Sequence, residues 1–563
     1  MNNHVTPILF GILYDNDYLT IWERATIEKL LHTSNTSLVL LIRVNFLDNK
    51  THSTNNFYNH LFYKNYLKWI HKPSTLRKTG IADLLEKTPL LICNAEKKTD
   101  KSYSLNDLDV SLIEKSELDF VLNYIKQPIS GSIFTACRLG IWGFLYGNKR
   151  QYRDTSTGFW EIYSKEATTT VSLCQFLNTH EYVILKEGFF RTRSYSHSSL
   201  IDCIYQELLN WPSDIRRQLL KHNSLTTHRT QHKLNNHEFL WPSNKQVLRF
   251  IIRLLKNKIK NLYRFLFLAD QWNIGVVNRP IKDFIYSENL KGATVDSPLL
   301  PNRNVFYADC FAQHTDSALT VYFEYYDYRI RRGNISKLNY PWQASSIPIK
   351  AIEFPYHLSY PFVFESYCIP EAWRTNSVCL YDTSKPIKNP SDGLVLLKDT
   401  PGIDSTLLKY KNRYWLFYTR ADRDPMLNLF ISYANSLEGP WYEHPQNPVK
   451  SDISSSRPAG PFFEVEGKLY RPSQDCTFDY GCGITINEVI ELTPFSFVEN
   501  KVNYLTSLHS DYPNGMHTIT AVDDRHTLID FKRYRFIPMA TLSALWMIFT
   551  PYFKINKGSL KKL

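Results

Sequence analysis

Three carboxylic acids in the second half of the chain, Asp309, Glu371 and Asp404, have the side chains needed for acid–base chemistry. Cleavage or transfer at a glycosidic bond uses two carboxyl groups, because one protonates the leaving oxygen while the other acts as a base or nucleophile. Each of the three comes from a different one of the first three repeats described below, and Glu365 is an alternative to Glu371. A turn cap or a strand-end carboxylate without chemistry remains open for every one of them.

A second set of polar residues follows, and we expect it to bind substrate. The planar fork of arginine suits a carboxylate or phosphate, so two arginines would fit an acidic sugar, a phosphorylated sugar or a nucleotide-sugar diphosphate. The same arginines could instead hold Asp475 or Asp404 in a structural ion pair. A histidine can bind a sugar hydroxyl or transfer a proton. The members of this set are Arg457, Arg471, Gln474, Asp475 and His517.

No metal site and no bound cofactor are predicted. The nine cysteines include no CxxC pair, and Cys476 and Cys482 have no matching histidine pair, so we expect ordinary thiols in a reducing compartment. No GxGxxG follows the first expected strand, where the sequence runs from Gly11 to Asp15, so a bound dinucleotide is not supported. Motifs of the GxSxG type and cysteine–histidine nucleophile motifs are absent as well.

The elements that must position the candidate residues form a repeat. From about Trp272 to Phe536, short aromatic strands alternate with turns in a loose repeat, in which a polar or charged residue precedes an apolar strand. The units start near Asp309, Pro361, Asp404, Ala459 and His517, at spacings of 52, 43, 55 and 58 residues. Five units of about 50 residues predict a five-bladed β-propeller, in which the leading residues line one axial pocket.

The first half alternates strands with helices. Apolar runs predict strands at Thr6–Tyr14, Ser37–Val44, Pro89–Ala95 and Leu118–Tyr124, and Trp22–His32 has the pattern of an amphipathic helix. This order predicts an α/β, Rossmann-like parallel sheet, with residues 130–212 continuing the unit.

The segment between the two halves changes in composition. Ser213–Asn244 is rich in polar residues and predicts a linker or a long surface loop, whereas Lys245–Leu268 has helical periodicity. That helix carries basic residues from Lys245 to Arg264, and no acidic residue occurs between Glu238 and Asp270. It is therefore either a membrane-surface element for an anionic membrane or an interdomain helix packed on a neighbour.

The C-terminal tail has a related pattern. Ile537–Phe553 carries no charge and lies between basic residues, so it is at the lower limit of length for a spanning helix. A C-terminal helix packed on the protein is the alternative.

Composition narrows the class of protein. The 563 residues are 43% hydrophobic, which excludes a mostly disordered chain, and the net charge of +12 favours anionic partners. No zinc finger, RNA-binding signature or helix-turn-helix motif stands out, so no nucleic-acid partner is expected. The N-terminus carries no secretion signal, so we expect a cytoplasmic protein, peripheral on the inner membrane face if it meets a membrane.

The second half resembles the N-terminal domain of plant glucosamine inositolphosphorylceramide transferases and its bacterial relatives. The matching stretches are HLSYPFVFE (357–365), CIPE (368–371), GPWYEHPQNPV (439–449), SRPAG (456–460), LYRPSQDC (469–476), YG (480–481) and HT (517–518). That domain is similar to the five-bladed propellers of arabinanase- and xylosidase-like glycoside hydrolases, and some propellers of this type are phosphorylases or glycosyltransferases. The resemblance implies Asp309 as base, although Cys310 follows where those propellers usually carry proline. With it we expect Glu371 as acid and Asp404 as an orienting neighbour.

The first half resembles, over residues 139–163 and 171–177, the N-terminal fold of methionyl-tRNA and sugar formyltransferases. An active enzyme of that kind needs an Asn-x-His pair and a later aspartate. Here Gly143–Asn148 contains no histidine, and the later acidic position reads Asn178–Glu181, where His180 and Glu181 would have to substitute. We therefore expect a degenerate domain.

Together these observations predict a formyltransferase-like α/β domain at 1–212, a linker with a basic helix at 213–269, a propeller at 270–536 and an apolar, basic tail at 537–563. The function expected is glycosyl transfer or glycoside cleavage in glycan or glycolipid biosynthesis, with a sugar, nucleotide-sugar or glycolipid as substrate. The alternatives are a sugar N-formyltransferase and a non-catalytic glycan-binding or scaffold protein.

Overall fold

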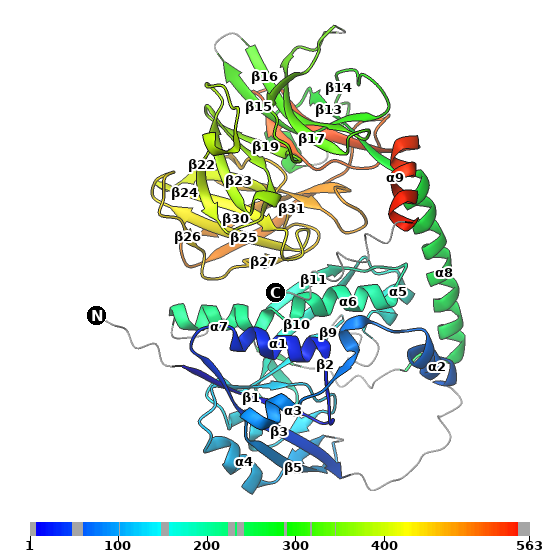
Figure 1. Cartoon of the computed structure of the whole chain (residues 1–563), viewed down its shortest axis with the longest axis vertical. Helices are drawn as coiled ribbons and strands as arrows, with labels where there is room; N and C mark the ends of the chain where they lie inside the picture. Colours follow the sequence, from blue (N-terminus) through cyan, green and yellow to red (C-terminus); the bar gives the residue numbers. More distant parts are fainter. Residues whose placement is uncertain are drawn as a thin grey trace. The chain divides into compact units, whose positions relative to one another are not determined.

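The chain divides into two compact units, residues 1–257 and 258–563. The computed structural model describes residues 7–47, 60–100, 102–147, 157–222, 231–233, 241–286, 290–315, 318–343 and 345–549. Figure 1 shows the first unit as a sheet with helices and the second as a ring of sheets.

The first unit is built on a ten-stranded mixed sheet with a parallel centre. Strands β9, β7, β1, β3 and β5 pair in parallel in that order, and β10 and β11 add antiparallel strands beyond β9. Six of the seven residues of β1 are buried, as expected for a central strand covered on both faces. The predicted strands are confirmed, and the sheet supports an α/β class. Its strands are β1 (Ile8–Tyr14), β2 (Leu19–Thr20), β3 (Thr36–Leu47), β4 (Lys78–Thr79), β5 (Leu90–Lys97), β6 (Tyr103–Leu105), β7 (Phe120–Asn123), β8 (Ile129–Ser130), β9 (Ile141–Tyr146), β10 (Thr168–Phe176), β11 (Glu181–Arg191) and β12 (Gln231–Lys233); β2 and β4 form a separate pair.

The helices of this unit correct one prediction. The start of the expected linker, Ser213–Asn244, is helical instead, because Ile215 and Leu219 turn into the core and Lys186 pairs with the buried Asp214 at 2.7 Å. Residues 223–230 and 234–240 of that segment lie outside the described residues. The helices are α1 (Ile21–Leu31), α2 (Leu61–Trp69), α3 (Ala82–Lys87), α4 (Asp107–Glu114), α5 (Phe159–Ser164), α6 (His197–Leu208) and α7 (Trp211–His222).

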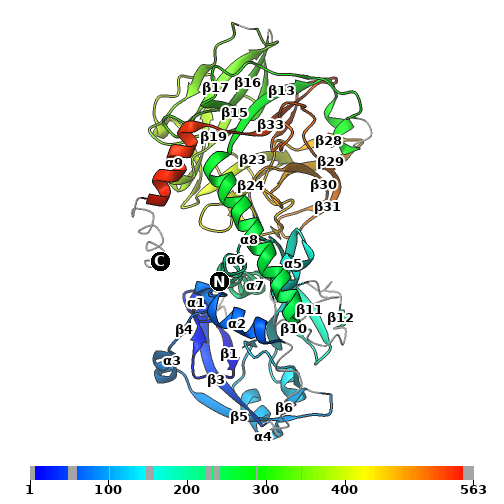
Figure 2. The same ribbon diagram turned by 90° about the vertical axis from the view of Figure 1, so that its right-hand side faces the viewer.

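The second unit is a five-bladed β-propeller, as the repeat predicts. Four blades are formed by consecutive strands, and the fifth joins β13 and β14 from the start of the unit to β32 and β33 from its end. Figure 2 shows one blade, β28 to β31, in strand order. The blades are β13 (Ala269–Val277), β14 (Val295–Asp296), β32 (Ile519–Ala521) and β33 (Thr527–Arg535); β15 (Val305–Thr315), β16 (Ala318–Asp327), β17 (Arg332–Tyr340) and β18 (Ile349–Ile352); β19 (Ser359–Phe364), β20 (Tyr367–Glu371), β21 (Ser377–Asp382) and β22 (Leu394–Lys398); β23 (Gly402–Tyr410), β24 (Arg413–Arg420), β25 (Asn428–Ala434), β26 (Tyr442–Glu443) and β27 (Lys450–Ser451); β28 (Phe463–Val465), β29 (Lys468–Asp475), β30 (Gly483–Leu492) and β31 (Phe497–Leu505).

The propeller core lies between neighbouring blades. One buried cluster joins Phe311, Phe362 and Leu416, which belong to three consecutive sheets. The aromatic residues that enrich this half of the sequence therefore serve mainly to pack sheet against sheet.

Two further helices flank the propeller strands in sequence. α8 (Asn244–Phe267) precedes β13 and covers the predicted helix Lys245–Leu268, and α9 (Pro538–Phe549) follows β33. Among the residues that the structure describes, no helix combines the length and the apolar character needed to cross a membrane. The expected tail continues beyond Phe549, outside the described residues.

Candidate active site in the propeller

The first strands of three blades share a bulge that turns one residue out of the strand pattern. The pairing register shifts between Ala308 and Phe311, between Ser359 and Phe362, and between Ile403 and Thr406. The residues in these bulges with a left-handed backbone are Asp309 (φ 53°), Tyr360 (φ 40°) and Asp404 (φ 48°), and Gly460 (φ 126°) shares this left-handed backbone in the next repeat. Bulges of this kind re-aim side chains beside functional sites. The repeat thus positions Asp309 and Asp404 by the same local device.

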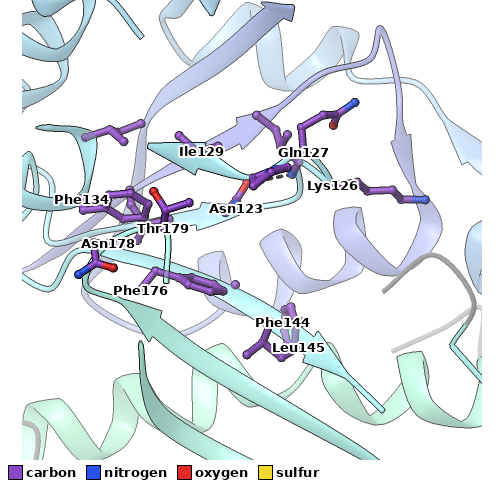
Figure 3. A pocket seen from close by; sticks show the side chains of 15 residues that line it. Asn123, Lys126, Gln127, Ile129, Phe134, Phe144, Leu145, Phe176, Asn178 and Thr179 are labelled. Atoms are coloured by element: carbon purple, nitrogen blue, oxygen red, sulfur yellow. Dashed lines mark hydrogen bonds between the residues drawn. The ribbon is translucent and has the colours of Figure 1, made fainter. Parts of the chain in front are cut away.

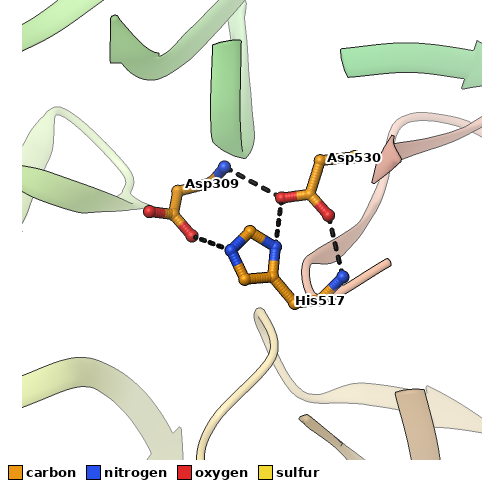
Figure 4. Close-up of side chains that lie close together, drawn as sticks. All are labelled: Asp309, His517 and Asp530. Carbon is orange, nitrogen blue, oxygen red and sulfur yellow. Dashed lines mark hydrogen bonds and ion pairs between the residues drawn. The ribbon is translucent and has the colours of Figure 1, made fainter. Parts of the chain in front are cut away.

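Asp309 belongs to a chain of three ionisable groups, which Figure 4 shows with the ring of His517 between two carboxylates. His517 Nε2 lies 3.3 Å from Asp309 Oδ1, and His517 Nδ1 lies 2.6 Å from Asp530 Oδ2. Asp530 also accepts hydrogen bonds from the backbone N–H groups of Asp309, His517 and Thr518. The indole of Trp272 stacks on the imidazole with centroids 3.9 Å apart. Asp309 is therefore held rigidly from one side.

Asp404 and Glu371 flank a single guanidinium group. Arg457 donates to Asp404 from Nε at 2.5 Å and from Nη2 at 3.2 Å, and its Nη2 lies 3.9 Å from Glu371 Oε2. Gln474 Nε2 donates to the same Asp404 carboxylate at 2.7 Å. Two of the expected substrate-binding residues thus bind a candidate catalytic carboxylate. This is the ion pair that the sequence left open for Arg457.

Burial separates the protonation states of these groups. Desolvation raises the pKa of Asp309 to about 6, despite the opposing effect of His517. It raises the pKa of Glu371 well above its ordinary value, and the negative charge of Asp404 adds to the effect. Burial alone would lower the pKa of His517, but Asp530 and Asp309 outweigh it and raise that pKa. These shifts favour the protonated form of Glu371 and of His517, and the pKa of about 6 favours an ionised Asp309 near pH 7.

The other predicted residues lie elsewhere in the blade. Arg471 donates to Glu499 from Nε at 2.7 Å and from Nη2 at 2.6 Å, and it also donates to the backbone oxygens of Ser455 and Ser456. Asp475 accepts from the backbone of Thr477, and burial raises its pKa. Arg471 is therefore bound by Glu499 and by two backbone oxygens, and none of its described contacts is with Asp309 or Glu371. Glu365, the alternative to Glu371, lies in the exposed turn between β19 and β20.

Three residues near the axial site were not found from the sequence. Asp530 and Glu324 lie within the strands β33 and β16 among apolar and aromatic residues, where no motif or spacing marks them. Both are buried, and burial together with the charges of Asp309 and Glu371 raises the pKa of Glu324 well above its ordinary value. The third is Tyr360, whose hydroxyl accepts from the N–H of Gly460 and lies 2.8 Å from the hydroxyl of Thr406. Asp530 and Glu324 differ from ordinary strand positions in their depth of burial, and Tyr360 differs in its left-handed backbone as well.

A metal ion has one candidate position among the described residues. Single ligand atoms of Asp309, His517 and Asp530 lie within 4.8 Å of one another, although the sequence predicts no metal cluster. Both ring nitrogens of His517 already face carboxylates, and its raised pKa favours the protonated ring, which cannot bind a metal. The donor set therefore fits a carboxylate–imidazolium–carboxylate chain better than a metal site.

The axial groups have little contact with solvent. Asp309, Glu371 and Asp404 are 4%, 8% and 2% exposed, and Arg457 is 8% exposed. What exposure remains is on the side of Glu371 and Arg457. A ligand that reaches these carboxyl groups has to enter there or displace side chains.

The first unit has a pocket of its own, with a volume of about 120 Å³. Figure 3 shows its lining, in which Asn123 and Thr179 lie near the ring of Phe176. The wall also includes Gly143 to Leu145 of β9, the region where the formyltransferase resemblance expects a histidine. His180 and Glu181 are not among the lining residues, although Asn178 and Thr179 are.

Comparison with known proteins addresses the propeller. Residues 291–521 match the family model described as glucosamine inositolphosphorylceramide transferase 1, N-terminal. The matched segment confirms the resemblance inferred from residues 357–518. The protein of that name from Oryza sativa subsp. indica is 35% identical over 213 residues, which cover 35% of this chain and 28% of the rice protein. The chain thus matches little more than a quarter of the length of this curated relative.

Two solved structures have weaker likenesses. A GH43_1 enzyme from Xanthomonas citri aligns with 42% of this chain and 89% of its own, at 14% identity and a TM-score of 0.29. Glycinamide ribonucleotide transformylase 1 from Symbiobacterium toebii aligns with 41% of this chain and 95% of its own, at 10% identity and a TM-score of 0.26. At these TM-scores neither structure carries an argument about this chain.

Proposed function

We propose that the propeller is the sugar-handling unit of a protein of glycan or glycolipid biosynthesis, and that it transfers or cleaves a glycosyl group at its axial carboxyl groups. The family match supports a sugar or glycolipid substrate, because the relatives are named glucosamine inositolphosphorylceramide transferases. A nucleotide-sugar donor belongs to the same proposal. We place the reaction in the cytoplasm, on the inner face of a membrane.

The separated protonation states of Glu371 and Asp309 carry this proposal. Acid–base catalysis at a sugar requires one protonated and one ionised carboxyl at the same pH. Burial holds the pKa of Glu371 well above its ordinary value, which favours the protonated acid, and the pKa of Asp309 is about 6, which favours an ionised base near pH 7. Arrangements that push the pKa values of neighbouring carboxyls apart are typical of acid and base pairs.

The proposed roles follow from these states. The Glu371 hydroxyl gives its proton to the leaving oxygen as the bond from that oxygen to the anomeric carbon breaks. Asp309 takes a proton from the incoming water or acceptor hydroxyl, whose oxygen forms the new bond to that carbon. Asp404, fixed by Arg457 and Gln474, lies beside Glu371, and its charge helps to raise the pKa of that acid.

The experiment is a turnover assay on the full chain, with a panel of 4-nitrophenyl glycosides and UDP-sugars as probes. We expect Asp309→Asn and Glu371→Gln each to lower turnover by at least about a hundredfold. Glu365→Gln is the matched control, because it removes a glutamate charge six residues from Glu371 in an exposed turn. A folded Asp309→Asn variant with unchanged turnover would remove the assignment.

A non-catalytic sugar-binding or scaffold module is the second candidate, and the low exposure of the site favours it. Asp309 and Asp404 are at most 4% exposed and fully engaged in ion pairs. This candidate predicts that sugars of the panel bind by calorimetry while no probe turns over.

A sugar N-formyltransferase is the third candidate, motivated by the pocket of the first unit. The pocket borders Gly143 and Thr179, which lie in the two stretches that the resemblance marks for formyl transfer. Binding of formyltetrahydrofolate, measured by calorimetry and lost in a Thr179→Arg variant, would support it. Absence of binding in the unaltered protein would remove it.

A further inference from the structure

The helix α8 buries one face and leaves a second apolar face open. Val247 and Phe250 are fully buried, and Phe250 stacks on Phe159 with centroids 4.3 Å apart. The opposite stripe is between 50% and 69% exposed, although every member is a leucine or isoleucine. Its members recur every three or four residues, so they share one face of the helix, and they are Leu248, Ile252, Leu255, Ile259 and Leu262.

The last two members of the stripe, Ile259 and Leu262, belong to the second unit. The register of the first blade pairs Ala269, two residues after α8, with Arg535, three residues before α9. The end of α8 and the start of α9 therefore leave the same edge of one sheet, and Figures 1 and 2 both draw them side by side. Exposed apolar side chains occur around this junction as well: Phe265, Phe267, Phe536, Met539 and Leu542. Monomeric soluble proteins rarely leave a continuous group of exposed apolar side chains of this kind uncovered.

The charged residues beside the stripe indicate which kind of partner would cover it. α8 carries seven lysines and arginines and no acidic residue. Arg264 is bound by Asp479 and stacks on Tyr534. Lys256, Lys258 and Lys260 are exposed, and within the described part of the chain no acidic side chain pairs with them. An apolar stripe bordered by these cations fits a membrane in which anionic head groups lie above an apolar layer of acyl chains.

A second copy of the chain fits this surface less well. Two α8 helices packed stripe to stripe would bring two cationic helices together without any acidic partner on either. An interfacial position, with the axis of α8 parallel to the membrane, places the stripe in the apolar layer and the cations of α8 at the head groups.

We propose that α8, together with Phe536 and α9, forms a docking surface for an anionic lipid membrane, and that this surface holds the protein at the face where glycolipids are made. The inference depends on the exposed stripe and its charges, and it stands whether or not the propeller is catalytic.

The test is co-flotation of the full chain with vesicles of phosphatidylcholine alone or with about one-third phosphatidylglycerol. We expect binding to the anionic vesicles only, and weaker binding at high salt. The double variant Ile252→Glu with Ile259→Glu should lower binding about a hundredfold, because two partly exposed isoleucines leave the apolar layer. Its matched control is Leu299→Glu with Ile347→Glu, which places the same changes on exposed apolar residues of the propeller.

A second pair of variants tests the charges. Removing three cations of α8 should lower binding about a hundredfold, at roughly fivefold for each lysine near the surface. The α8 variant is Lys256→Gln, Lys258→Gln and Lys260→Gln, and its control is Lys291→Gln, Lys398→Gln and Lys409→Gln. Because all of these side chains are exposed, thermal unfolding should show no change in folding.

The outcomes are distinct. Selective loss of binding in both α8 variants supports the proposal. Equal binding of the α8 variants and their controls would overturn it, and so would a failure of the unaltered protein to bind anionic vesicles. A dimer in sedimentation experiments that dissociates in the isoleucine variant, without vesicle binding, would assign the surface to a second copy instead. None of these results depends on glycosyl turnover, so they are independent of the proposed function.

Discussion

Replacing Arg457 by methionine would test how the axial carboxyl groups are held. Arg457 is the only cation described within 4 Å of Asp404, to which it donates at 2.5 and 3.2 Å, and it lies 3.9 Å from Glu371. After the substitution Gln474 is the remaining side-chain donor to Asp404, so a buried charge loses its counter-ion.

The magnitude follows from the burial of the pair. Both side chains are at most 10% exposed, and removing one partner of such a pair costs about 3–5 kcal/mol. In a unit of this size, that loss corresponds to a fall of roughly 10 °C in the unfolding midpoint. Adding Asp404→Asn removes the stranded charge, so the double variant should recover part of the loss.

Scanning calorimetry of the full chain measures this effect. The matched control is Lys385→Met, which breaks an ion pair with Asp382 where the lysine side chain is 76% exposed, and its midpoint should not move. A midpoint for Arg457→Met within experimental error of the unaltered protein would refute the reasoning. So would a double variant that is less stable than Arg457→Met alone.

Three further predictions concern stability and binding. The pKa of Asp309 rises on folding from 3.8 to about 6, so the stability that this group contributes is present below pH 3.8 and is lost as the pH rises through about 6. Between pH 4 and 7 the unfolding midpoint should therefore fall less for Asp309→Asn than for the unaltered protein. Parallel curves of midpoint against pH would contradict this. Arg471→Met should lower the unfolding midpoint, because Glu499 then keeps only Lys450 as an ion-pair partner. Sugar binding measured by calorimetry should not change. A loss of sugar binding without a loss of stability would instead support Arg471 as a ligand-binding residue. Gly460→Ala should abolish soluble expression or strongly lower the midpoint, because the added methyl would overlap the carbonyl oxygen of Ile519 and the backbone is left-handed; an unchanged midpoint would contradict that geometry.

Most of the propeller could be predicted from the sequence, because the sequence repeat reflects a structural feature of the blades. In three blades a bulge in the first strand turns one residue out of the strand pattern, and in two of them that residue is an aspartate ahead of an apolar strand, so Asp309 and Asp404 could be found this way. In the second blade the left-handed residue is Tyr360, one position before the predicted Pro361. A tyrosine there gives no polar signal, and for that reason the bulge was not visible in the sequence.

The partners of the site could not be found in the same way. Asp530 pairs with a histidine 13 residues before it, and Glu499 of β31 pairs with an arginine 28 residues before it in β29, two strands away in the same blade. Such pairs depend on which strands are adjacent and on their register, which periodicity does not give. The polar composition of residues 213–222 was misleading for a similar reason, because Ile215 and Leu219 contribute to the core of the first unit while the rest of α7 is mostly polar.

The leaving-group dependence of Glu371→Gln tests the central claim most directly. A glycoside found to turn over in the panel would be compared with its 2,4-dinitrophenyl counterpart, whose phenolate departs without a proton. If Glu371 is the acid, the variant loses turnover of the ordinary glycoside by about a hundredfold or more and keeps most of its turnover of the activated one. An equal loss on both substrates, or no loss on either, would contradict the account.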